Sequence, residues 1–553
     1  MKQIPFHLFF LLIALSSCVP TYDVIIRNGN IYDGSGLPAY QADLGIKGNK
    51  IVFIGDLKKT KGKSELDASG KAVSPGFINM LSWANNALLK DGRSMSDIKQ
   101  GVTLEIFGEG ASMGPLNESM KEARGGAATW TTLGEYLDYL VEKGVSTNVA
   151  SFVGATTVRI NVLGYENRKP TQEQLIRMQE LVREAMEEGA MGLGTSLIYP
   201  PAFFADTDEL IALAKAASEY DGMYISHLRS EGNSFLQAVD ELITIADQAK
   251  IDAEIYHLKA AGKGNWNKLD KAVEKIDSAN KAGLAISTNM YNYTAASTGL
   301  DATLPPWVQE GGKEQWLERM KTPQIREKIL QEMGEESDKW ENFYQMAGSP
   351  ENIVLAEFDE DSLAYLAGKS LKEIAAIRNT SPEETIIELI LDNGGDISTI
   401  YFLMSEENIK KKIKLSYMTF GSDAGSFAAE GETIESKTHP RAYGNFARLL
   451  GQYVREEKVI SLEEAIYRLT ALSAQKLKIR DRGRLAPGYF ADIVIFDPEL
   501  VNDKATYDDP HQYAIGVEHV FVNGKQVLKN GEHTRAMPGM VVRGPGYQKD
   551  EVE

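Results

Sequence analysis

Cysteine is almost absent from this chain of 553 residues, in which Cys18 is the only one. The protein that follows Cys18 therefore has no internal disulfide and no thiolate ligand to offer a metal ion. Positive charge is also in deficit: 59 Lys and Arg stand against 78 Asp and Glu, a net charge of −19. This balance repels phosphate backbones and anionic headgroups at a distance, so no nucleic-acid partner is expected.

Long apolar runs are missing too, apart from one at the N-terminus that extends from about Ile4 to Leu15. It is too short to span a bilayer as a stable helix and is typical of an export signal. The order Leu, Ser, Ser, Cys that ends it resembles the bacterial lipobox. This predicts a signal peptide over residues 1–18 with Cys18 lipidated, although a plain cleaved signal with an incidental cysteine is the alternative. We expect a protein of the bacterial cell envelope, facing the periplasm or at the cell surface, that meets the membrane only through its lipid anchor.

The chain has an ordinary globular composition, with two β-rich ends around a middle part in which strands and helices alternate. Its length indicates two or three domains. Short alternating runs with Asn-Gly and Gly-Asn turns occupy residues 22–73, and residues 483–545 repeat this pattern around Asn523-Gly524. We expect the two ends to form one small β-sandwich domain.

Between these ends, over residues 74–482, predicted strands and helices alternate. One helix, over 171–189, opens with a capping box formed by Thr171 and Gln174. Several strand-helix units in series predict an α/β fold with a parallel sheet, most simply a closed barrel, because no glycine-rich dinucleotide fingerprint marks the first turn. Residues from about 304 to 415 are rich in Lys and Glu, and we interpret them as a helical elaboration that forms a lid.

Two histidines, His227 in YISHLRSEG and His257 in AEIYHLKAAG, stand where buried runs give way to polar residues. They lie 30 positions apart, about one βαβ repeat. Both imidazoles would then emerge at the carboxyl end of neighbouring strands, where barrels carry out chemistry. A lone buried histidine is more often a core residue, but the equivalent placement of two favours a metal site. The histidines in loop or β-flank settings are not expected to be ligands: His439, His511, His519 and His533.

A metal held by this pair suits hydrolysis of an unactivated amide. Zinc lowers the pKa of water toward about 7 and polarises a carbonyl, and imidazole nitrogens are ligands that it prefers. Glu109 in FGEGAS is placed to complete the ligand set, and Asp423 in FGSDAG to move the proton from water to the leaving nitrogen. The alternatives are a solvated turn residue for Glu109 and a helix N-cap for Asp423.

Several longer motifs follow one another along nearly the whole mature chain: YDVIIRNGNIYDGSG, SPGFIN, VREAMEEGAMGLGTSLIYPP, SHLRSEG, YHLKAAG, YTAASTGL, FGSDAG, HPRAYGNFARLLG and RGRLAPGYFADIVIFDP. With these motifs in this order, the chain resembles the D-aminoacylase (N-acyl-D-amino-acid deacylase) family of the metal-dependent amidohydrolase superfamily. The resemblance implies a (β/α)8 TIM-like barrel flanked by a small β-sandwich, zinc, and release of a free D-amino acid from its N-acyl derivative.

The resemblance also implies roles for individual residues. The family's two metal-binding histidines match His227 and His257, and its catalytic aspartate matches Asp423. Its groups that hold the substrate carboxylate match Lys259, Tyr291, Ser297 and Arg441. An arginine that binds a carboxylate through two hydrogen bonds orients it as well as attracting it.

The chain departs from the family at several metal ligands. Where the superfamily has His-x-His after Pro-Gly-Phe-Ile, this chain has Leu81 and Trp83, which do not bind zinc. A usual histidine after Val-Gly is Ala155, and the family's metal-binding cysteine aligns with Glu109. We therefore expect a single Zn²⁺ held by Glu109, His227 and His257.

The leading hypothesis is a zinc-dependent amidohydrolase whose small-molecule substrate is an N-acyl-D-amino acid. A hydrolase of another amide, such as a dipeptide or a cyclic imide, is the alternative among enzymes. A non-catalytic binding protein of the envelope is the alternative outside them. The missing His-x-His motivates the binding protein, and the presence of His227, His257 and Asp423 argues against it.

Overall fold

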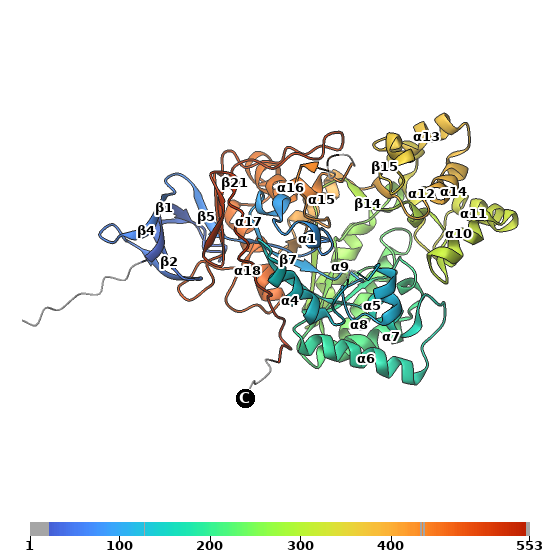
Figure 1. The fold of residues 1–553 in the computed structure, drawn as a ribbon, viewed down its shortest axis with the longest axis horizontal. Helices are drawn as coiled ribbons and strands as arrows, with labels where there is room; N and C mark the ends of the chain where they lie inside the picture. Colours follow the sequence, from blue (N-terminus) through green and yellow to red (C-terminus); the bar gives the residue numbers. More distant parts are fainter. Residues whose placement is uncertain (1–21, 127, 432–433, 435–436, 549–553) are drawn as a thin grey trace, which may run out of the picture.

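The computed structural model describes residues 22–126, 128–431, 434 and 437–548. The predicted signal peptide, with Cys18, lies outside the described residues. A β sheet stands at one end of the elongated molecule, an α/β body follows, and a further segment forms the other end (Figure 1). Over the described part of the chain, none of the helices combines the length and the apolar character needed to cross a membrane.

The terminal sheet takes strands from both ends of the chain. The strands are β1 Tyr22–Ile31, β2 Tyr40–Lys47, β3 Lys50–Gly55, β4 Gly62–Asp67, β5 Ala72–Pro75, β18 Ile493–Phe496, β19 Val517–Val522, β20 Lys525–Lys529 and β21 Glu532–His533. They pair in the order β21-β20-β19-β18-β5-β1-β2-β3, with β4 beside β1. Asn523 and Gly524 join β19 to β20 with positive φ at both residues, as a tight two-residue hairpin turn requires.

The body is built on parallel strands. They are β6 Phe77–Asn79, β7 Val102–Phe107, β8 Asn148–Ser151, β9 Val153–Gly154, β10 Gly192–Ser196, β11 Met223–His227, β12 Asp252–Ile255, β13 Ile286–Met290 and β17 Met418–Phe420. One sheet has the order β6-β7-β8 and the other β17-β13-β12-β11-β10-β9. Strand β8 runs on into β9, and a parallel bridge between Ser82 and Ala424 links the segments after β6 and β17. The strands therefore follow a cyclic order, and their carboxyl ends lie on one side.

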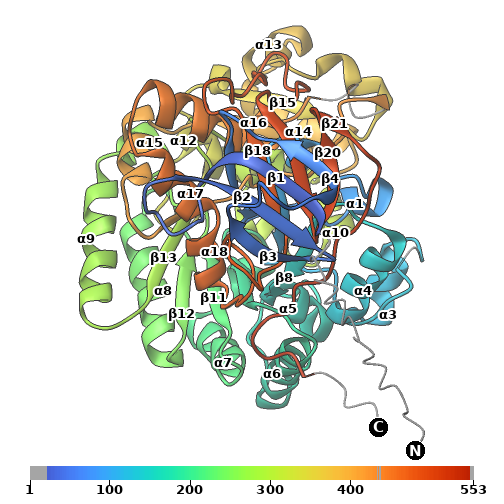
Figure 2. The ribbon, with the colours of Figure 1, turned by 90° about the vertical axis from the view of Figure 1, so that its left-hand side faces the viewer.

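Helices cover the outside of these strands. They are α1 Ala87–Lys90, α2 Met95–Ile98, α3 Glu118–Ala123, α4 Leu133–Lys143, α5 Ala155–Leu163, α6 Gln172–Glu187, α7 Thr207–Ser218, α8 Phe235–Ala249, α9 Lys268–Lys281, α15 Glu406–Ile413, α16 Arg441–Arg448, α17 Leu462–Leu469 and α18 Ala471–Lys476. Figure 2 shows α7, α8 and α9 outside β11, β12 and β13. The predicted capping box opens α6: Thr171 Oγ1 accepts the Gln174 N–H, and the Gln174 side chain accepts the Thr171 N–H. The apolar face of α6, with Met178 and Val182, is buried.

The predicted helical elaboration also contains strands, which corrects the sequence-based expectation. Its helices are α10 Lys313–Lys321, α11 Pro323–Gly334, α12 Phe343–Ala347, α13 Leu371–Arg378 and α14 Pro382–Asp392. Two strands of this segment, β15 Ile353–Glu357 and β16 Ser398–Phe402, pair with the preceding β14 Ala295–Gly299 in the order β14-β16-β15. These strands are too short for their alternation to stand out between Lys- and Glu-rich helices. Because β14 belongs to both the inserted sheet and the motif YTAASTGL, the insertion reaches the candidate site.

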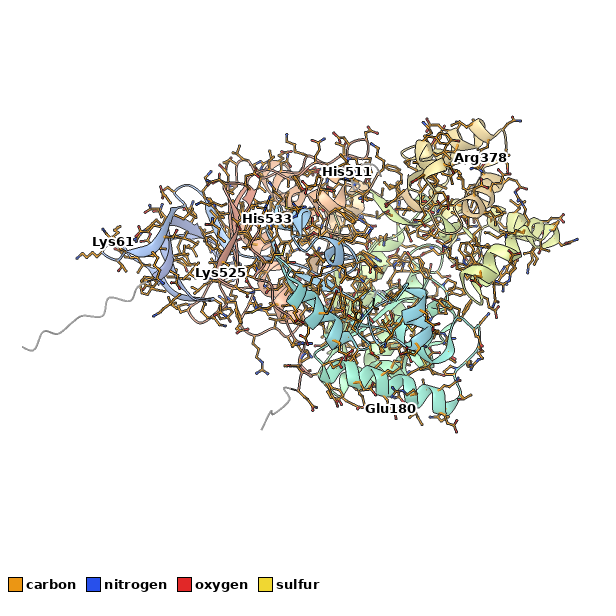
Figure 3. The ribbon with its side chains drawn as sticks, in the orientation of Figure 1. Lys61, Glu180, Arg378, His511, Lys525 and His533 are labelled. Atoms are coloured by element: carbon orange, nitrogen blue, oxygen red, sulfur yellow. The ribbon has the colours of Figure 1, made fainter. Side chains whose placement is uncertain are left out.

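Charged side chains are spread over widely separated parts of the molecule. Figure 3 labels Lys61 in the terminal sheet region, Glu180 on α6 and Arg378 on α13, at widely separated edges of the molecule. His533 on β21 lies 3.0 Å from Ser146 Oγ, and His511 lies 3.2 Å from the Tyr443 hydroxyl. These contacts are local, and neither histidine belongs to a cluster that fits a metal among the described residues.

Candidate metal centre and active site

Three side chains meet at the carboxyl ends of the body strands. Glu109 follows β7, His227 ends β11 and His257 follows β12. Glu109 Oε1 lies 3.2 Å from His227 Nδ1 and 2.8 Å from His257 Nε2. One ligand atom from each residue lies within 4.8 Å of the others. The structure thus brings together the three residues that the sequence predicts to hold the metal.

The chemistry of this donor set suits zinc. Two imidazoles and one carboxylate form a familiar set of three protein ligands that leaves a coordination position open. Glu109, His227 and His257 are each at most 4% exposed. Burial at this level keeps bulk water away from the ligands and strengthens their electrostatic attraction for a cation.

The charges around these ligands also favour a cation. Burial would raise the pKa of Glu109, but the charge of His257 and hydrogen bonds from both histidines hold it below its usual value. Burial and the neighbouring Lys259 would lower the pKa of His257, yet the carboxylates of Glu231 and Glu109 raise it to about 9. With this pKa, His257 is protonated at neutral pH in the metal-free site, and its charge and that of Lys259 balance the charges of Glu109 and Glu231. A metal ion would take the place of the His257 proton and supply the positive charge that the two carboxylates attract.

Glu231 supports the site from behind His257. Its Oε1 lies 3.0 Å from His257 Nδ1 and accepts a 2.7 Å hydrogen bond from Lys259 Nζ. A carboxylate on the outer nitrogen of a metal-binding histidine fixes the ring and its tautomer. Lys259, which the family resemblance assigns to the substrate carboxylate, is thus already paired with Glu231 in this structure. Its side chain nevertheless lines the same cavity, and its substrate role stays a prediction.

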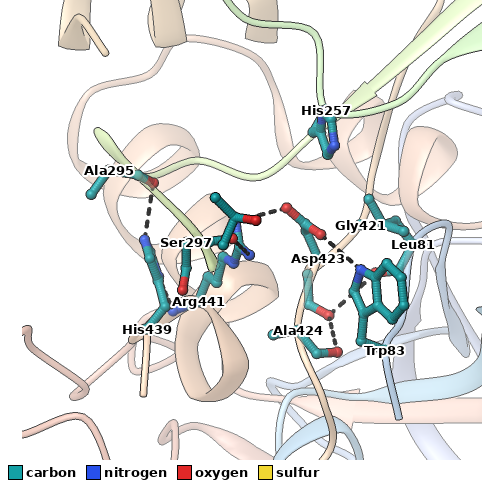
Figure 4. A network of polar contacts seen from close by, with 12 residues as sticks. Leu81, Trp83, His257, Ala295, Ser297, Gly421, Asp423, Ala424, His439 and Arg441 are labelled. Atoms are coloured by element: carbon teal, nitrogen blue, oxygen red, sulfur yellow. Dashed lines mark hydrogen bonds and ion pairs between the residues drawn. The ribbon is translucent and has the colours of Figure 1, made fainter. Parts of the chain in front are cut away.

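Asp423 lies across the cavity from the histidines, after β17. Its Oδ2 is 2.7 Å from Arg441 Nη1, at the start of α16. The Arg441 guanidinium in turn lies 4.4 Å from the centre of the Tyr291 ring. Burial raises the pKa of Asp423 above its usual value, against the opposing effect of Arg441 and with the help of Glu109. Figure 4 shows Asp423 between Arg441 on one side and Trp83 on the other.

A cavity of about 820 Å³ joins these groups. All eight residues predicted for the metal, the proton transfer and the substrate line it: Glu109, His227, His257, Lys259, Tyr291, Ser297, Asp423 and Arg441. Arg441 Nε and the Tyr291 hydroxyl are buried and have no hydrogen-bond partner among the described residues. Two donors left unpaired in this way suit an anionic group of a substrate, because an unsatisfied buried donor is costly.

Three residues of the site were not identified from the sequence. Trp83, considered only as a missing ligand, donates its indole N–H to Glu109 Oε2 and Asp423 Oδ1 at 2.9 and 3.2 Å. His439 ties the Arg441 backbone to β14 by accepting the Arg441 N–H and bonding the Ala295 carbonyl, each at 3.0 Å. Glu231 is the third, and its place four residues after His227 in SHLRSEG is a signal that could have revealed it.

Comparison with known proteins gives consistent relatives. The Amidohydrolase family model matches residues 418–528. D-aminoacylase from Alcaligenes xylosoxydans xylosoxydans is 31% identical over 528 residues, which cover 94% of this chain and 97% of the relative. N-acyl-D-glutamate deacylase from Bordetella bronchiseptica, solved with zinc and a phosphonate mimic of the tetrahedral intermediate, superposes with a TM-score of 0.79 at 27% identity, covering 95% of this chain and 100% of that one.

A structure of D-aminoacylase concerned with its binuclear metal centre, in which one metal activates and the second attenuates, is similar as well. It has a TM-score of 0.77 at 28% identity and covers 94% of this chain and 100% of that one. The fold of the chain is therefore that of the TIM-barrel type found in these amidohydrolases.

Proposed function

Because the chain belongs to the D-aminoacylase family of amidohydrolases, we propose that it hydrolyses N-acyl-D-amino acids to a free D-amino acid and a carboxylate. It is a metal-dependent hydrolase of linear amides. The observation that carries the proposal is the meeting of Glu109, His227 and His257 opposite Asp423 and Arg441 in one cavity. The residues expected to hold the metal, move the proton and bind the substrate thus line one cavity.

Zinc bound by Glu109, His227 and His257 would supply Lewis acidity to the acyl carbonyl and lower the pKa of the attacking water. The protein itself moves the proton. Asp423 accepts it as water adds to the acyl carbon and returns it to the amide nitrogen as the C–N bond breaks. Nitrogen then leaves as the amine of the free amino acid, and the acyl group leaves as a carboxylate.

Arg441 would select substrates with a free α-carboxylate. Its guanidinium can offer two parallel N–H donors to a carboxylate, and Tyr291 and Ser297 line the cavity beside it. In this structure Arg441 is paired with Asp423 Oδ2. A substrate carboxylate competes for the same guanidinium, so its arrival frees the oxygen of Asp423 that accepts the proton.

We propose one zinc ion per chain. Leu81 and Trp83 bring no metal-binding atom to the positions of His-x-His, and the indole N–H of Trp83 points at Glu109 Oε2. A hydrogen-bond donor on that oxygen opposes a second cation there. Elemental analysis of protein saturated with zinc and then desalted should give one equivalent; two equivalents would refute the single-ion site.

A substrate panel tests the activity. The zinc-loaded protein should cleave N-acetyl-D-amino acids faster than their L-enantiomers, and should cleave neither dipeptides nor cyclic imides at a comparable rate. The carboxamides of the same N-acetyl-D-amino acids should be poor substrates because they lack the carboxylate. Zinc-loaded protein that cleaves none of the N-acetyl-D-amino acids would overturn the proposal.

The architecture and location are proposed with the activity. The cyclic order of the parallel strands supports a (β/α)8 barrel over residues 74–482, and the shared terminal sheet supports a composite β domain of residues 22–73 and 483–545.

The lipobox-like sequence supports a lipid-anchored envelope protein. Metabolic labelling with a fatty acid should mark the wild-type protein in bacteria and not Cys18→Ser; an unlabelled wild type would rule the anchor out.

A further inference from the structure

Trp83 is fixed against the loop that carries Asp423 by backbone contacts. The Trp83 N–H donates to the Ala424 carbonyl, and the Asp423 N–H donates to the Leu81 carbonyl, both at 2.9 Å. At Gly421 a Cβ atom would lie 2.7 Å from the Leu81 nitrogen, so only glycine permits this close approach. Trp83 and Asp423 are 340 positions apart in sequence. These backbone contacts nevertheless leave the two segments little freedom to move relative to each other.

From this position the indole N–H reaches two carboxylates at once. It lies 2.9 Å from Glu109 Oε2 and 3.2 Å from Asp423 Oδ1. The other oxygens point elsewhere, Glu109 Oε1 to the two histidines and Asp423 Oδ2 to Arg441. All four carboxylate oxygens therefore have a partner, and Trp83 is the one partner that the two carboxylates share.

We propose that Trp83 is a positioning residue for deacylation, whose indole N–H holds Asp423 by Oδ1 and thereby leaves Oδ2 as the oxygen that transfers the proton. This inference rests on the proposed function. When a substrate carboxylate takes Arg441, Oδ2 loses its partner, and Trp83 keeps the carboxylate from rotating away. The same N–H lies between the carboxylates of Glu109 and Asp423 and holds these two like charges at a fixed distance from each other.

A tryptophan at this place could instead serve only as a wall, since it is 38% exposed and lines the cavity. The two roles differ in what they require. A wall needs the ring, whereas positioning needs the N–H. Trp83→Phe keeps an aromatic ring and removes the donor, and Trp83→Gln removes the ring and keeps an N–H of similar reach.

Kinetics separate these roles. Trp83→Phe should lower kcat by roughly 10- to 100-fold, since misplacement of a catalytic group by a fraction of an ångström to 1 Å has costs of this order, with KM within about twofold because Arg441 is unchanged. Its zinc content should equal that of the wild type, and Trp83→Gln should recover part of kcat. The matched control is Trp307→Phe, which removes a 2.7 Å hydrogen bond from an indole to Glu332 in the insertion. If Trp83→Phe retains wild-type kcat, or loses zinc in proportion to activity, the positioning role is refuted.

A measurement without turnover distinguishes failure of this inference from failure of the proposed function. In protein labelled with ¹⁵N at its six tryptophan indoles, the signal absent from Trp83→Phe identifies Trp83. It should have the downfield proton shift of a charge-assisted hydrogen bond and move in Asp423→Asn and in Glu109→Gln. An unshifted signal, or one that ignores both substitutions, overturns the inference even if the enzyme is active; a shifted signal in a protein that deacylates nothing overturns the proposed function alone.

Discussion

The two sides of the cavity are built on different principles. On the side of β7, β11 and β12, one oxygen of Glu109 is shared by two histidines, with Glu231 behind them. On the side of β6, β17 and α16, Asp423 has separate partners on its two oxygens, an indole and a guanidinium. The first side converges on a point, as a cation requires, and the second leaves a carboxylate with one partner that a substrate can replace.

This difference predicts different consequences of substitution. We call the side of β7, β11 and β12 the converging side; removing one of its groups should remove the metal and, with it, the reaction. We call the side of β6, β17 and α16 the exchanging side; removing one of its groups should leave the metal in place and change either the rate or the binding of substrate. Zinc content measured beside kcat and KM can therefore confirm or break the division.

The largest effect is expected for His257→Ala. The Nε2 atom of His257 contacts Glu109 and its Nδ1 atom contacts Glu231, so loss of the ring removes a ligand and leaves two buried carboxylates without the group between them. Zinc should fall well below one equivalent after desalting, and activity should drop by about 10³-fold or more, since the Lewis acid and the activated water are both lost. His533→Ala, in the terminal sheet, is the control. Full zinc retention in His257→Ala would show that the converging side is not the metal centre.

Asp423→Asn should come next in size and should leave zinc unchanged. The amide keeps the shape of the side chain and can still accept the indole N–H, but it does not take a proton. General acid-base catalysis of this kind contributes about 10²- to 10⁴-fold, and kcat should fall within that range. KM should fall as well, because the neutral amide no longer competes with the substrate carboxylate for Arg441. Steady-state kinetics with parallel zinc analysis is the measurement. A variant that loses zinc as well would join Asp423 to the metal side.

Arg441→Lys should act mainly on substrate binding. A lysine keeps the charge but not the two parallel N–H donors of the guanidinium. We expect KM to rise by roughly 10-fold or more, of the order of a charge-assisted hydrogen bond, with zinc intact. The N-acetyl-D-amino acid and its carboxamide should differ greatly for the wild type and much less for the variant. An equal loss on both substrates would indicate that Arg441 acts only through Asp423.

The converging side could be predicted from the sequence and the exchanging side only in part. His227 and His257 share a strand-loop pattern one βαβ repeat apart, so their proximity follows from local periodicity. Asp423 was inferred from its place after a predicted strand, and Arg441 came from the family resemblance. Neither source gave the ion pair between them. Trp83 carried no signal except the absence of histidine, because its partners Glu109 and Asp423 lie 26 and 340 positions away.

The insertion shows the same limit at the level of the fold. Its helices were visible as Lys- and Glu-rich amphipathic segments, whereas β15 and β16 were not, since each has five residues and pairs with the earlier β14. Lys259 shows it at the level of one side chain. The family resemblance gave Lys259 a role in substrate binding, and the tertiary structure gives it Glu231 as a partner.

The smallest effect concerns Glu341, which joins the insertion to the converging side by accepting hydrogen bonds from the Glu231 backbone N–H and from Ser230 Oγ. Burial, and then the charge of Glu231, raise its pKa to about 8 from an ordinary value of 4.5. The folded protein thus keeps a proton between these values that the unfolded chain releases, so this contribution to stability is complete below pH 4.5 and is lost as pH rises through 8.

Glu341→Gln keeps the accepting oxygen and removes the ionisation. The variant should match the wild type within about 1 °C at pH 5 and melt higher at pH 9, by roughly 3–4 °C for a protein of this size. Thermal unfolding of the zinc-free proteins at both pH values measures it, with the exposed Glu335→Gln as the control from the same segment. Parallel pH dependences for wild type and Glu341→Gln would mean that Glu341 is already ionised in the folded protein. The converging side would then carry a third negative charge, and the wild type should bind zinc more tightly than the variant.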